Sequence, residues 1–379
     1  MNFHAKFYQC WLFVRNIFRN FVNYFDYFFW RITHWRIKPV KELKRAVIFN
    51  LRYMGDLMVT TPLLHSLKIH YGSENILVIN KNMKEFAMLL PYVDKVYIYK
   101  GFKDFLDFLK TIKSDAIFIL TPASYIISLV ALIRGVRYRI GALSSGIIEP
   151  KGLFLTHKIS HRLKHRVEQI LEICKIIGIK PSSELKIRVN EDAKKRIQGI
   201  LEELGVANEP FILLHPCARD MHKYKYPAYE WEKEKWGELA KELAELGYFV
   251  IFTGVKDDEE YIQSILCDID SAKCKSLAGR INIQELVAVI SQSKLLVAVD
   301  TGVIHIAVAL DVPVVDLMGP TPPEIWHPWA KEDRYKVIFH QNVCNSCRSY
   351  SCRLKYNICV KSIQVDEVFK ACCELLRKG

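Results

Sequence analysis

The sequence alternates between short apolar runs and helical patterns, and this alternation constrains the fold more than any other feature. In the first half, apolar runs lie at 46–51, 76–79, 96–99 and 116–120, with helical patterns at 57–70, 84–89, 103–113 and 125–134. Such alternation predicts right-handed βαβ units and a parallel sheet. The second half repeats it, with strands expected at 211–215, 248–253, 295–299 and 314–318. We therefore expect an α/β protein with two similar domains facing each other across a cleft.

The length and the apolar content both allow two domains. The chain has 379 residues, of which 50% are hydrophobic, and this is enough for two separate cores. The stretch 180–210 contains two prolines and many charges, as expected between domains. We expect an N-terminal extension at 1–40, a first domain at 41–190 and a second at 191–379, the last with a cysteine-rich segment at 344–359 and a C-terminal helix.

Charge and cysteine usage limit the function classes. The formal net charge is +13, which suits an anionic partner such as nucleic acid, a membrane surface or a phosphorylated substrate. No DNA-recognition or RNA-binding signature accompanies this charge, so nucleic acid is not the expected partner. The Gly-x-Gly-x-x-Gly fingerprint is absent, which weighs against a nicotinamide dehydrogenase. The eleven cysteines follow no secretory leader, so we expect a cytoplasmic protein.

Residues 1–38 differ from the rest of the chain. Aromatic and aliphatic side chains recur there at three- and four-residue steps, so a helix would carry a continuous aromatic stripe beside basic residues. No apolar run reaches the roughly 20 residues of a membrane-spanning helix. The pattern predicts a helix lying on a membrane surface, with packing against the protein's own core as the alternative.

The stretch 295–321 has the pattern of a ligand site. An apolar strand ends at Asp300-Thr301-Gly302, His305 follows in the first turn of a short helix, and a second strand ends at Gly319-Pro320-Thr321. Neighbouring strand ends with small residues form the usual crevice for a phosphorylated ligand in an α/β sheet. The pattern therefore predicts a nucleotide-diphosphate site. The alternative is that the glycines only form turns and that His305 is a core histidine with its hydrogen bonds satisfied.

Two further stretches carry polar residues where strands end. The first strand leads into Arg52-Tyr53-Met54-Gly55-Asp56, where Asp56 either caps the following helix or acts on a ligand. The strand at 211–215 leads into a long basic and aromatic loop at 216–231 that contains Lys223 and Lys225. Loops of this length inside a compact domain are usually functional.

Several motifs together resemble one family, the ADP-heptose:lipopolysaccharide heptosyltransferases of glycosyltransferase family 9. They occur in the family's order from about 45 to 377: the motif around Met54-Gly55-Asp56, Leu213-Leu214-His215-Pro216, the 223–240 region, Phe252-Thr253-Gly254, Leu277-Ala278-Gly279, Asp300-Thr301-Gly302-x-x-His305 and Gly319-Pro320-Thr321. The resemblance implies a GT-B enzyme with two Rossmann-like domains, inversion at the anomeric carbon and no catalytic metal or other required cofactor. It also implies a nucleotide diphosphate sugar donor, and a lipopolysaccharide or other lipid-linked acceptor on the cytoplasmic face of the inner membrane.

The resemblance also implies roles for individual residues. Asp56 matches the proposed general base, and Arg52 and Gly55 are expected at the acceptor. Asp300, Thr301, Gly302, His305, Gly319 and Thr321 match the nucleotide-sugar site. Lys223, favoured over Lys225, is expected to contact phosphate, and Asp258 is expected to contact the ribose. A nucleotide-sugar hydrolase, or a related protein that has lost transfer, is the alternative, and retention of Asp56 argues against it.

Four cysteines, Cys344, Cys347, Cys352 and Cys359, lie within 16 residues. Thiolates at this density are able to hold a structural zinc ion or an iron–sulfur cluster. The spacing lacks the long middle gap of ordinary zinc motifs, so a loop of free thiols is the alternative.

Overall fold

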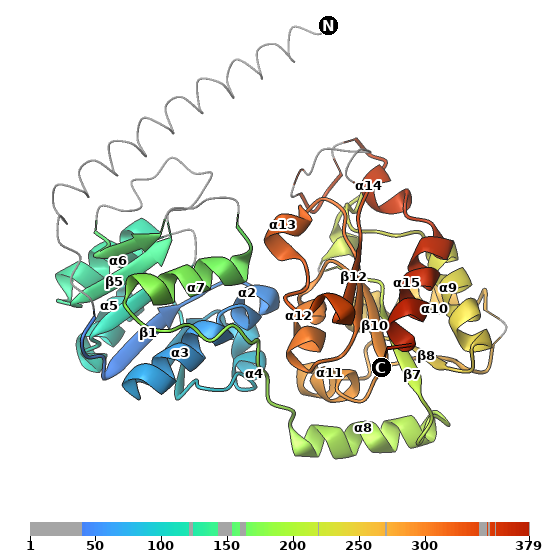
Figure 1. The fold of residues 1–379 in the computed structure, drawn as a ribbon, viewed down its shortest axis with the longest axis horizontal. Coiled ribbons are helices and arrows are strands. Elements are labelled where there is room, and N and C mark those ends of the chain that lie inside the picture. Colours follow the sequence, from blue (N-terminus) through green and yellow to red (C-terminus); the bar gives the residue numbers. More distant parts are fainter. Residues whose placement is uncertain are drawn as a thin grey trace, which may run out of the picture. The chain divides into compact units, whose positions relative to one another are not determined.

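The fold is taken from a computed structural model, which describes residues 40–120, 124–142, 154–159, 164–218, 220–269, 271–340, 347, 349–352 and 354–378. The chain packs as two compact units (Figure 1). Unit 1 comprises the described residues up to Arg52 together with Pro62–Ala87 and Tyr92–Ser183. Unit 2 comprises Tyr53–Thr61, Met88–Pro91 and the described residues from Glu184 onward. The aromatic segment 1–38 lies outside the described residues.

Unit 1 is built on a parallel sheet of six strands in the order β3-β2-β1-β4-β5-β6. Its strands are β1 Arg45–Phe49, β2 Glu74–Ile79, β3 Lys95–Ile98, β4 Ala116–Ile119, β5 Tyr138–Ala142 and β6 His157–Ile159. Its helices are α3 Thr61–Tyr71, which begins at the border of unit 2, α4 Lys84–Ala87, α5 Phe102–Ile112, α6 Ser124–Ile133 and α7 Arg166–Ile176.

Unit 2 repeats this architecture with the order β12-β11-β10-β7-β8-β9, again all parallel. Its strands are β7 Phe211–His215, β8 Phe249–Phe252, β9 Cys274–Ser276, β10 Leu295–Val299, β11 Val314–Leu317 and β12 Tyr335–Ile338. Its helices are α2 Met54–Met58, α8 Glu191–Glu203, α9 Lys233–Glu245, α10 Glu259–Leu266, α11 Ile283–Ile290, α12 Gly302–Ala309, α13 Pro323–Trp326, α14 Ile358–Lys361 and α15 Val365–Leu376. The prediction of two α/β domains with parallel sheets is confirmed.

The sheet of unit 2 separates an apolar face from a partly polar one. Side chains of alternate residues on β7, β8, β10 and β11 join α9, α10 and α15 in one buried hydrophobic cluster. The other face carries His215, Ala298 and Asp316, because Ala298 pairs with both of the others across the parallel strands. Paired residues on neighbouring strands point to the same face. This second face therefore brings polar groups to the carboxyl ends of its strands.

Local sequence signals explain where helices begin and end. Asn282 caps α11: its Oδ1 accepts from Gln284 N (2.9 Å) and Glu285 N (3.0 Å), while the backbone N–H of Asn282 donates to Glu285 Oε2 (2.8 Å). The single helix expected at 57–70 was wrong, because the chain forms α2 and α3 instead. Pro62 favours a new helix start, and the Thr60 hydroxyl bonds the carbonyl of Asp56 at 2.8 Å.

Candidate active site

The ends of β10 and β11 hold the Asp300-Thr301-Gly302 turn in place. The backbone N–H of Asp300 donates to Leu317 O at 3.2 Å, which ties the turn to the neighbouring strand. Thr321 connects the second turn to the first, because its hydroxyl hydrogen-bonds the Asp300 side chain. The same hydroxyl lies 2.9 Å from the Tyr229 hydroxyl. Burial raises the pKa of Asp300 to about 6, and the Thr321 hydrogen bond opposes part of this shift. The two predicted turns therefore form one polar site.

Thr301 and His305 bring unsatisfied polar atoms to the start of α12. His305 is 2% exposed, and its Nδ1, like Thr301 Oγ1, has no hydrogen-bond partner within the described part of the chain. Burial and the nearby His327 lower the pKa of His305 to about 4, so the ring is neutral at pH 7. Buried polar atoms without partners are costly and rare in native proteins. This is not the pattern of a core histidine with its hydrogen bonds satisfied.

Two glycines allow α2 to pack against α12 within unit 2. A Cβ added to Gly302 would lie 2.9 Å from Gly55 N, and one added to Gly55 would lie 3.2 Å from His305 Cδ2. Real Cβ atoms do not approach a backbone nitrogen that closely, so Gly302 is required for this contact. Asp56 is the next residue of α2 after Gly55, and it is 7% exposed. The Met54-Gly55-Asp56 segment of α2 therefore packs against the first turn of α12, which carries His305.

The polar face adds two groups that the sequence analysis did not assign to the site. His215 is buried, its Nδ1 lies 2.9 Å from Thr253 Oγ1, and burial lowers its pKa to about 4. Asp316 is completely buried, and neither carboxyl oxygen has a hydrogen-bond partner among the described residues. Burial, and then the charge of Asp300, raise the pKa of Asp316 well above its usual range. A single carboxyl inside the apolar run 314–318 was the available signal for Asp316.

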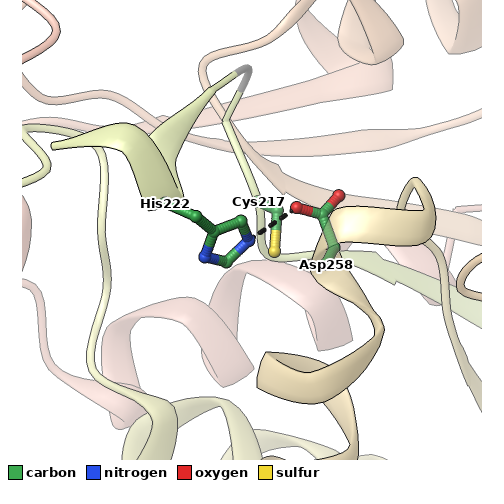
Figure 2. A group of neighbouring side chains, drawn as sticks. All are labelled: Cys217, His222 and Asp258. Carbon is green, nitrogen blue, oxygen red and sulfur yellow. Dashed lines mark hydrogen bonds and ion pairs between the residues drawn. The ribbon is translucent and has the colours of Figure 1, made fainter.

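A second polar group lies at the ends of β7 and β8 (Figure 2). His222, in the short 3-10 helix Met221–Lys223, places its Nε2 2.8 Å from Asp258 Oδ1. Asp258 Oδ2 accepts from Val255 N at 2.8 Å, and the buried thiol of Cys217 also hydrogen-bonds Asp258. Asp258 therefore faces the loop after β7, and its expected contact with the ribose stays a prediction.

The predicted phosphate-binding lysine is paired elsewhere. Lys223 Nζ donates to Asp220 Oδ1 at 2.7 Å, and 70% of its side chain is exposed. Lys225 Nζ lies 5.6 Å from the centre of the Tyr226 ring. Arg52 belongs to unit 1, where its backbone N–H donates to Asn50 Oδ1 at 3.1 Å. The roles predicted for Lys223 and Arg52 remain predictions.

The second turn and the cysteine-rich segment meet at Gly319. A Cβ at Gly319 would lie 2.3 Å from Val360 Cγ2, so this turn also requires glycine. Cys359 is buried, Cys352 is partly buried and Cys347 is exposed, while Cys344 lies outside the described residues. Cys352 Sγ accepts a hydrogen bond from Asn357 N at 3.1 Å. The four-cysteine metal cluster therefore stays a prediction.

The described residues contain no helix that is both long enough and apolar enough to cross a bilayer.

The chain is similar to a known family and to several of its members. The family model of glycosyltransferase family 9 (heptosyltransferase) matches residues 107–357. Lipopolysaccharide heptosyltransferase 3 from Escherichia coli (strain K12) is 26% identical over 300 residues, covering 74% of this chain and 84% of that protein.

Two solved structures share the fold over nearly their whole length. The glycosyl transferase family 9 protein from Veillonella parvula DSM 2008 has a TM-score of 0.73 and 22% identity, covering 89% of this chain and 98% of that one. The E. coli ADP-heptose lps heptosyltransferase II has a TM-score of 0.70 and 23% identity, covering 88% of this chain and 99% of that one. The GT-B fold predicted from the motifs is confirmed.

Proposed function

Because the chain belongs to glycosyltransferase family 9, the heptosyltransferases, we propose that it transfers a heptose from ADP-heptose to a lipopolysaccharide core. The family resemblance inferred from the motifs is confirmed, and the chain is a glycosyltransferase. The choice of donor and acceptor follows the names of two similar proteins, a lipopolysaccharide heptosyltransferase and an ADP-heptose lps heptosyltransferase. Another nucleotide sugar or another surface saccharide is the alternative.

The observation that carries the proposal is the pair of unsatisfied buried atoms at the start of α12. Thr301 Oγ1 and His305 Nδ1 lack partners within the described residues and lie at the amino end of the helix. Helix N-termini favour anions, because the first backbone N–H groups are unpaired and the helix dipole is positive there. A neutral His305 is able to donate from Nδ1 to a phosphate oxygen. A diphosphate therefore supplies the acceptors that this turn lacks.

We propose that the other residues of the nucleotide-sugar site surround this turn. Asp300, Gly302, Gly319 and Thr321 shape the diphosphate site, and Asp258 accepts hydrogen bonds from the ribose hydroxyls. Lys223 exchanges its ion pair with Asp220 for the diphosphate. A cation there stabilises the charge that builds up on the leaving group.

Asp56 acts as the general base in the proposed reaction, and Arg52 and Gly55 contact the acceptor. Asp56 takes the proton of an acceptor hydroxyl while that oxygen attacks the anomeric carbon. The bond between this carbon and the diphosphate oxygen breaks, and ADP leaves with the electron pair. Attack from the face opposite ADP inverts the anomeric configuration, and no metal or other cofactor takes part in these steps.

Residues 1–38, outside the described residues, are proposed to hold the enzyme on the cytoplasmic face of the inner membrane. Their basic residues attract anionic lipid, and the aromatic stripe adds an apolar contribution that salt does not weaken. Sedimentation with anionic vesicles tests this proposal, using the full chain and a chain starting near Lys41. Equal sedimentation of both, with a large loss of thermal stability in the shorter chain, would show that the segment packs on the protein itself.

The function is tested by offering the purified protein a panel of nucleotide sugars with crude lipopolysaccharide cores. We expect ADP-heptose to give a core that is heavier by one heptose, with release of ADP. Proton coupling at the new anomeric centre reports inversion. Absence of both transfer and ADP binding would overturn the proposal, whereas transfer from another nucleotide sugar would replace the donor.

A further inference from the structure

Three side chains with metal-ligating atoms converge beside the proposed donor site. Within the residues that the structure describes, Cys217, His222 and Asp258 are the one group of three or more such residues whose ligating atoms lie within 4.8 Å of one another. They come from the end of β7, the 3-10 helix after it and the start of α10 (Figure 2). Donor atoms on one tetrahedral zinc ion, each about 2.0–2.3 Å from it, lie about 3.3–3.8 Å apart. Side-chain movements of about 1 Å therefore place all three on one ion.

The donor set selects the class of metal. A thiolate, an imidazole and a carboxylate are the three ligand types that zinc accepts, whereas magnesium and calcium prefer oxygen ligands alone. Three protein ligands leave a fourth position for water or another molecule. The site therefore suits a borderline divalent cation such as Zn²⁺.

Two carboxylates make the surroundings of Cys217 electronegative. Burial, followed by the Asp258 carboxylate and then Glu230, raises the pKa of the Cys217 thiol. A bound cation reverses this effect, because it stabilises the thiolate directly.

The site is both oriented and accessible. Asp258 Oδ2 is held by Val255 N at 2.8 Å, which leaves Oδ1 directed at His222. His222 has 34% of its side chain exposed and so provides a route for the ion from solvent.

We propose that Cys217, His222 and Asp258 form a zinc-binding site at the ends of β7 and β8. The ion replaces the 2.8 Å hydrogen bond between His222 and Asp258 with two coordinate bonds and takes the proton from the Cys217 thiol into solvent. The zinc site stands without any assumption about catalysis. One consequence does rest on the proposed function: a bound zinc ion engages Asp258 and so weakens ADP binding.

Zinc binding to the full chain tests the site. Wild-type protein is stripped with a chelator, kept reduced, titrated with Zn²⁺ in a calorimeter, and analysed for bound metal after dialysis. Cys217→Ala and His222→Gln each remove one ligand, and both are expected to bind one zinc ion fewer per chain than wild type. Cys274→Ala is the matched control, because Cys274 is also a buried cysteine of unit 2 but lies outside the cluster. All four proteins retain the cysteines at 344–359, so metal bound there is common to them.

The outcomes separate the site from the proposed function. Loss of one zinc ion in both variants, with wild-type binding in Cys274→Ala and unchanged thermal melting, supports the site. Wild-type zinc stoichiometry and affinity in either Cys217→Ala or His222→Gln overturns it. ADP titration with and without zinc then follows: zinc is expected to weaken ADP binding in wild type and not in Cys217→Ala. A chain that binds zinc but never binds ADP would keep the metal site and reject the proposed donor.

Discussion

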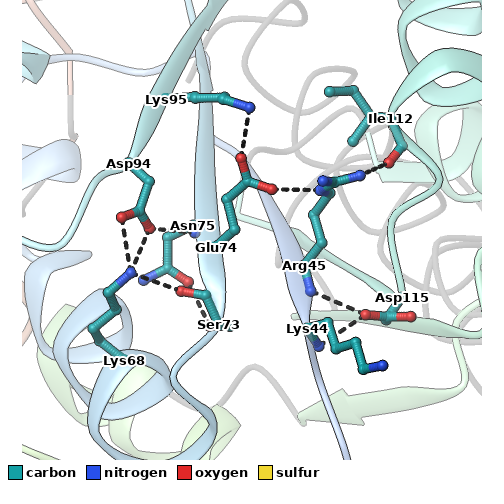
Figure 3. A network of polar contacts seen from close by, with 10 residues as sticks. All are labelled: Lys44, Arg45, Lys68, Ser73, Glu74, Asn75, Asp94, Lys95, Ile112 and Asp115. Carbon is teal, nitrogen blue, oxygen red and sulfur yellow. Dashed lines mark hydrogen bonds and ion pairs between the residues drawn. The ribbon is translucent and has the colours of Figure 1, made fainter.

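The two sheets share one architecture, but each carries a polar cluster at a different end of its strands. In unit 1 the polar residues of Figure 3 gather where strands begin, at Arg45, Glu74, Lys95 and Asp115, and they are paired with one another or with backbone groups. In unit 2 the polar residues Thr301, His305 and Asp316 lie where strands end or just beyond, and each has a buried atom without a partner among the described residues. The difference suggests that the first set stabilises the fold, while the second is maintained for a ligand.

The network of unit 1 shows what satisfied polar groups look like. Glu74 accepts from Arg45 Nε at 2.5 Å and from Lys95 Nζ at 2.7 Å, and these hydrogen bonds lower its pKa. Asn75 is completely buried, yet its Nδ2 donates to Leu64 O (3.0 Å) and Tyr92 O (2.9 Å). Each of these groups has a hydrogen-bond or ion-pair partner within the protein, so no ligand is needed to explain why the network is present.

The largest expected effect is on catalysis and comes from unit 2. Asp56→Asn keeps the size of the side chain and removes its basicity, so transfer is expected to fall by roughly 100- to 10,000-fold with little change in stability. Initial rates of ADP release with saturating donor and acceptor measure this effect. Wild-type turnover in the variant would mean that Asp56 only supports helix α2.

A smaller effect is expected on donor binding. Asp300→Ala or His305→Ala removes a side chain from the turn that is proposed to bind the diphosphate. A hydrogen bond to a charged group contributes about 1.5–3 kcal/mol. ADP affinity is therefore expected to fall by roughly 10- to 100-fold. Calorimetric titration with ADP measures it, and acceptor binding serves as the control. Unchanged ADP affinity in both variants would remove this turn from the donor site.

The matching change in unit 1 is expected to affect stability alone. Asn75→Ala removes the buried amide that donates to the Leu64 and Tyr92 carbonyls, at a cost of about 2 kcal/mol of unfolding free energy. Urea denaturation gives the loss of stability, and ADP affinity at a temperature where the variant is folded is expected to match wild type. A specific loss of ADP affinity in the folded variant would contradict the contrast between the two units.

The smallest expected effect is a gain in stability that depends on pH. Native Asp316 keeps its proton to higher pH than an unfolded aspartate, whose pKa is about 3.9. The native state therefore binds more protons above that pH, and wild-type stability attributable to Asp316 is lost as pH rises. Asp316→Asn removes this titration and is expected to stabilise the protein, by more at pH 8 than at pH 5.

Urea denaturation of both proteins at the two pH values measures this difference. His215 and His305 are present in both proteins and titrate with the opposite sign, because their pKa values are lowered. Asp300 is also present in both, and its charge contributes to the raised pKa of Asp316. An equal stability difference at both pH values would show that the Asp316 carboxyl does not titrate differently on folding.

The sequence predicted the fully buried strands well and the polar edges poorly. Strands 211–215 and 295–299 coincide with β7 and β10, because a strand buried on both faces is a continuous apolar run. The short strand β6, His157–Ile159, carries buried polar residues and has no such run. Propensity alone also missed the break between α2 and α3.

The site was predictable where chemistry follows a local motif. The Asp300-Thr301-Gly302-x-x-His305 spacing places one turn at a strand end, so the position of these residues at the junction of β10 and α12 was predicted directly. Asp316 was not found, because its place beside Ala298 depends on the register between strands. The pairing of Lys223 with Asp220 depends on the fold of a long loop, which no periodicity specifies.

The packing of α2 within unit 2 has a consequence for the order in which the enzyme is made. Helix α2 ends at Met58, whereas its partner α12 begins at Gly302. A ribosome adding about 5–20 residues per second needs on the order of 10–50 s to make the roughly 240 residues between them. A helix of five residues is not stable alone during that interval. The segment that carries Asp56 therefore lacks its packing partner during most of synthesis, and the contact between α2 and α12 forms only after most of the polypeptide has left the ribosome.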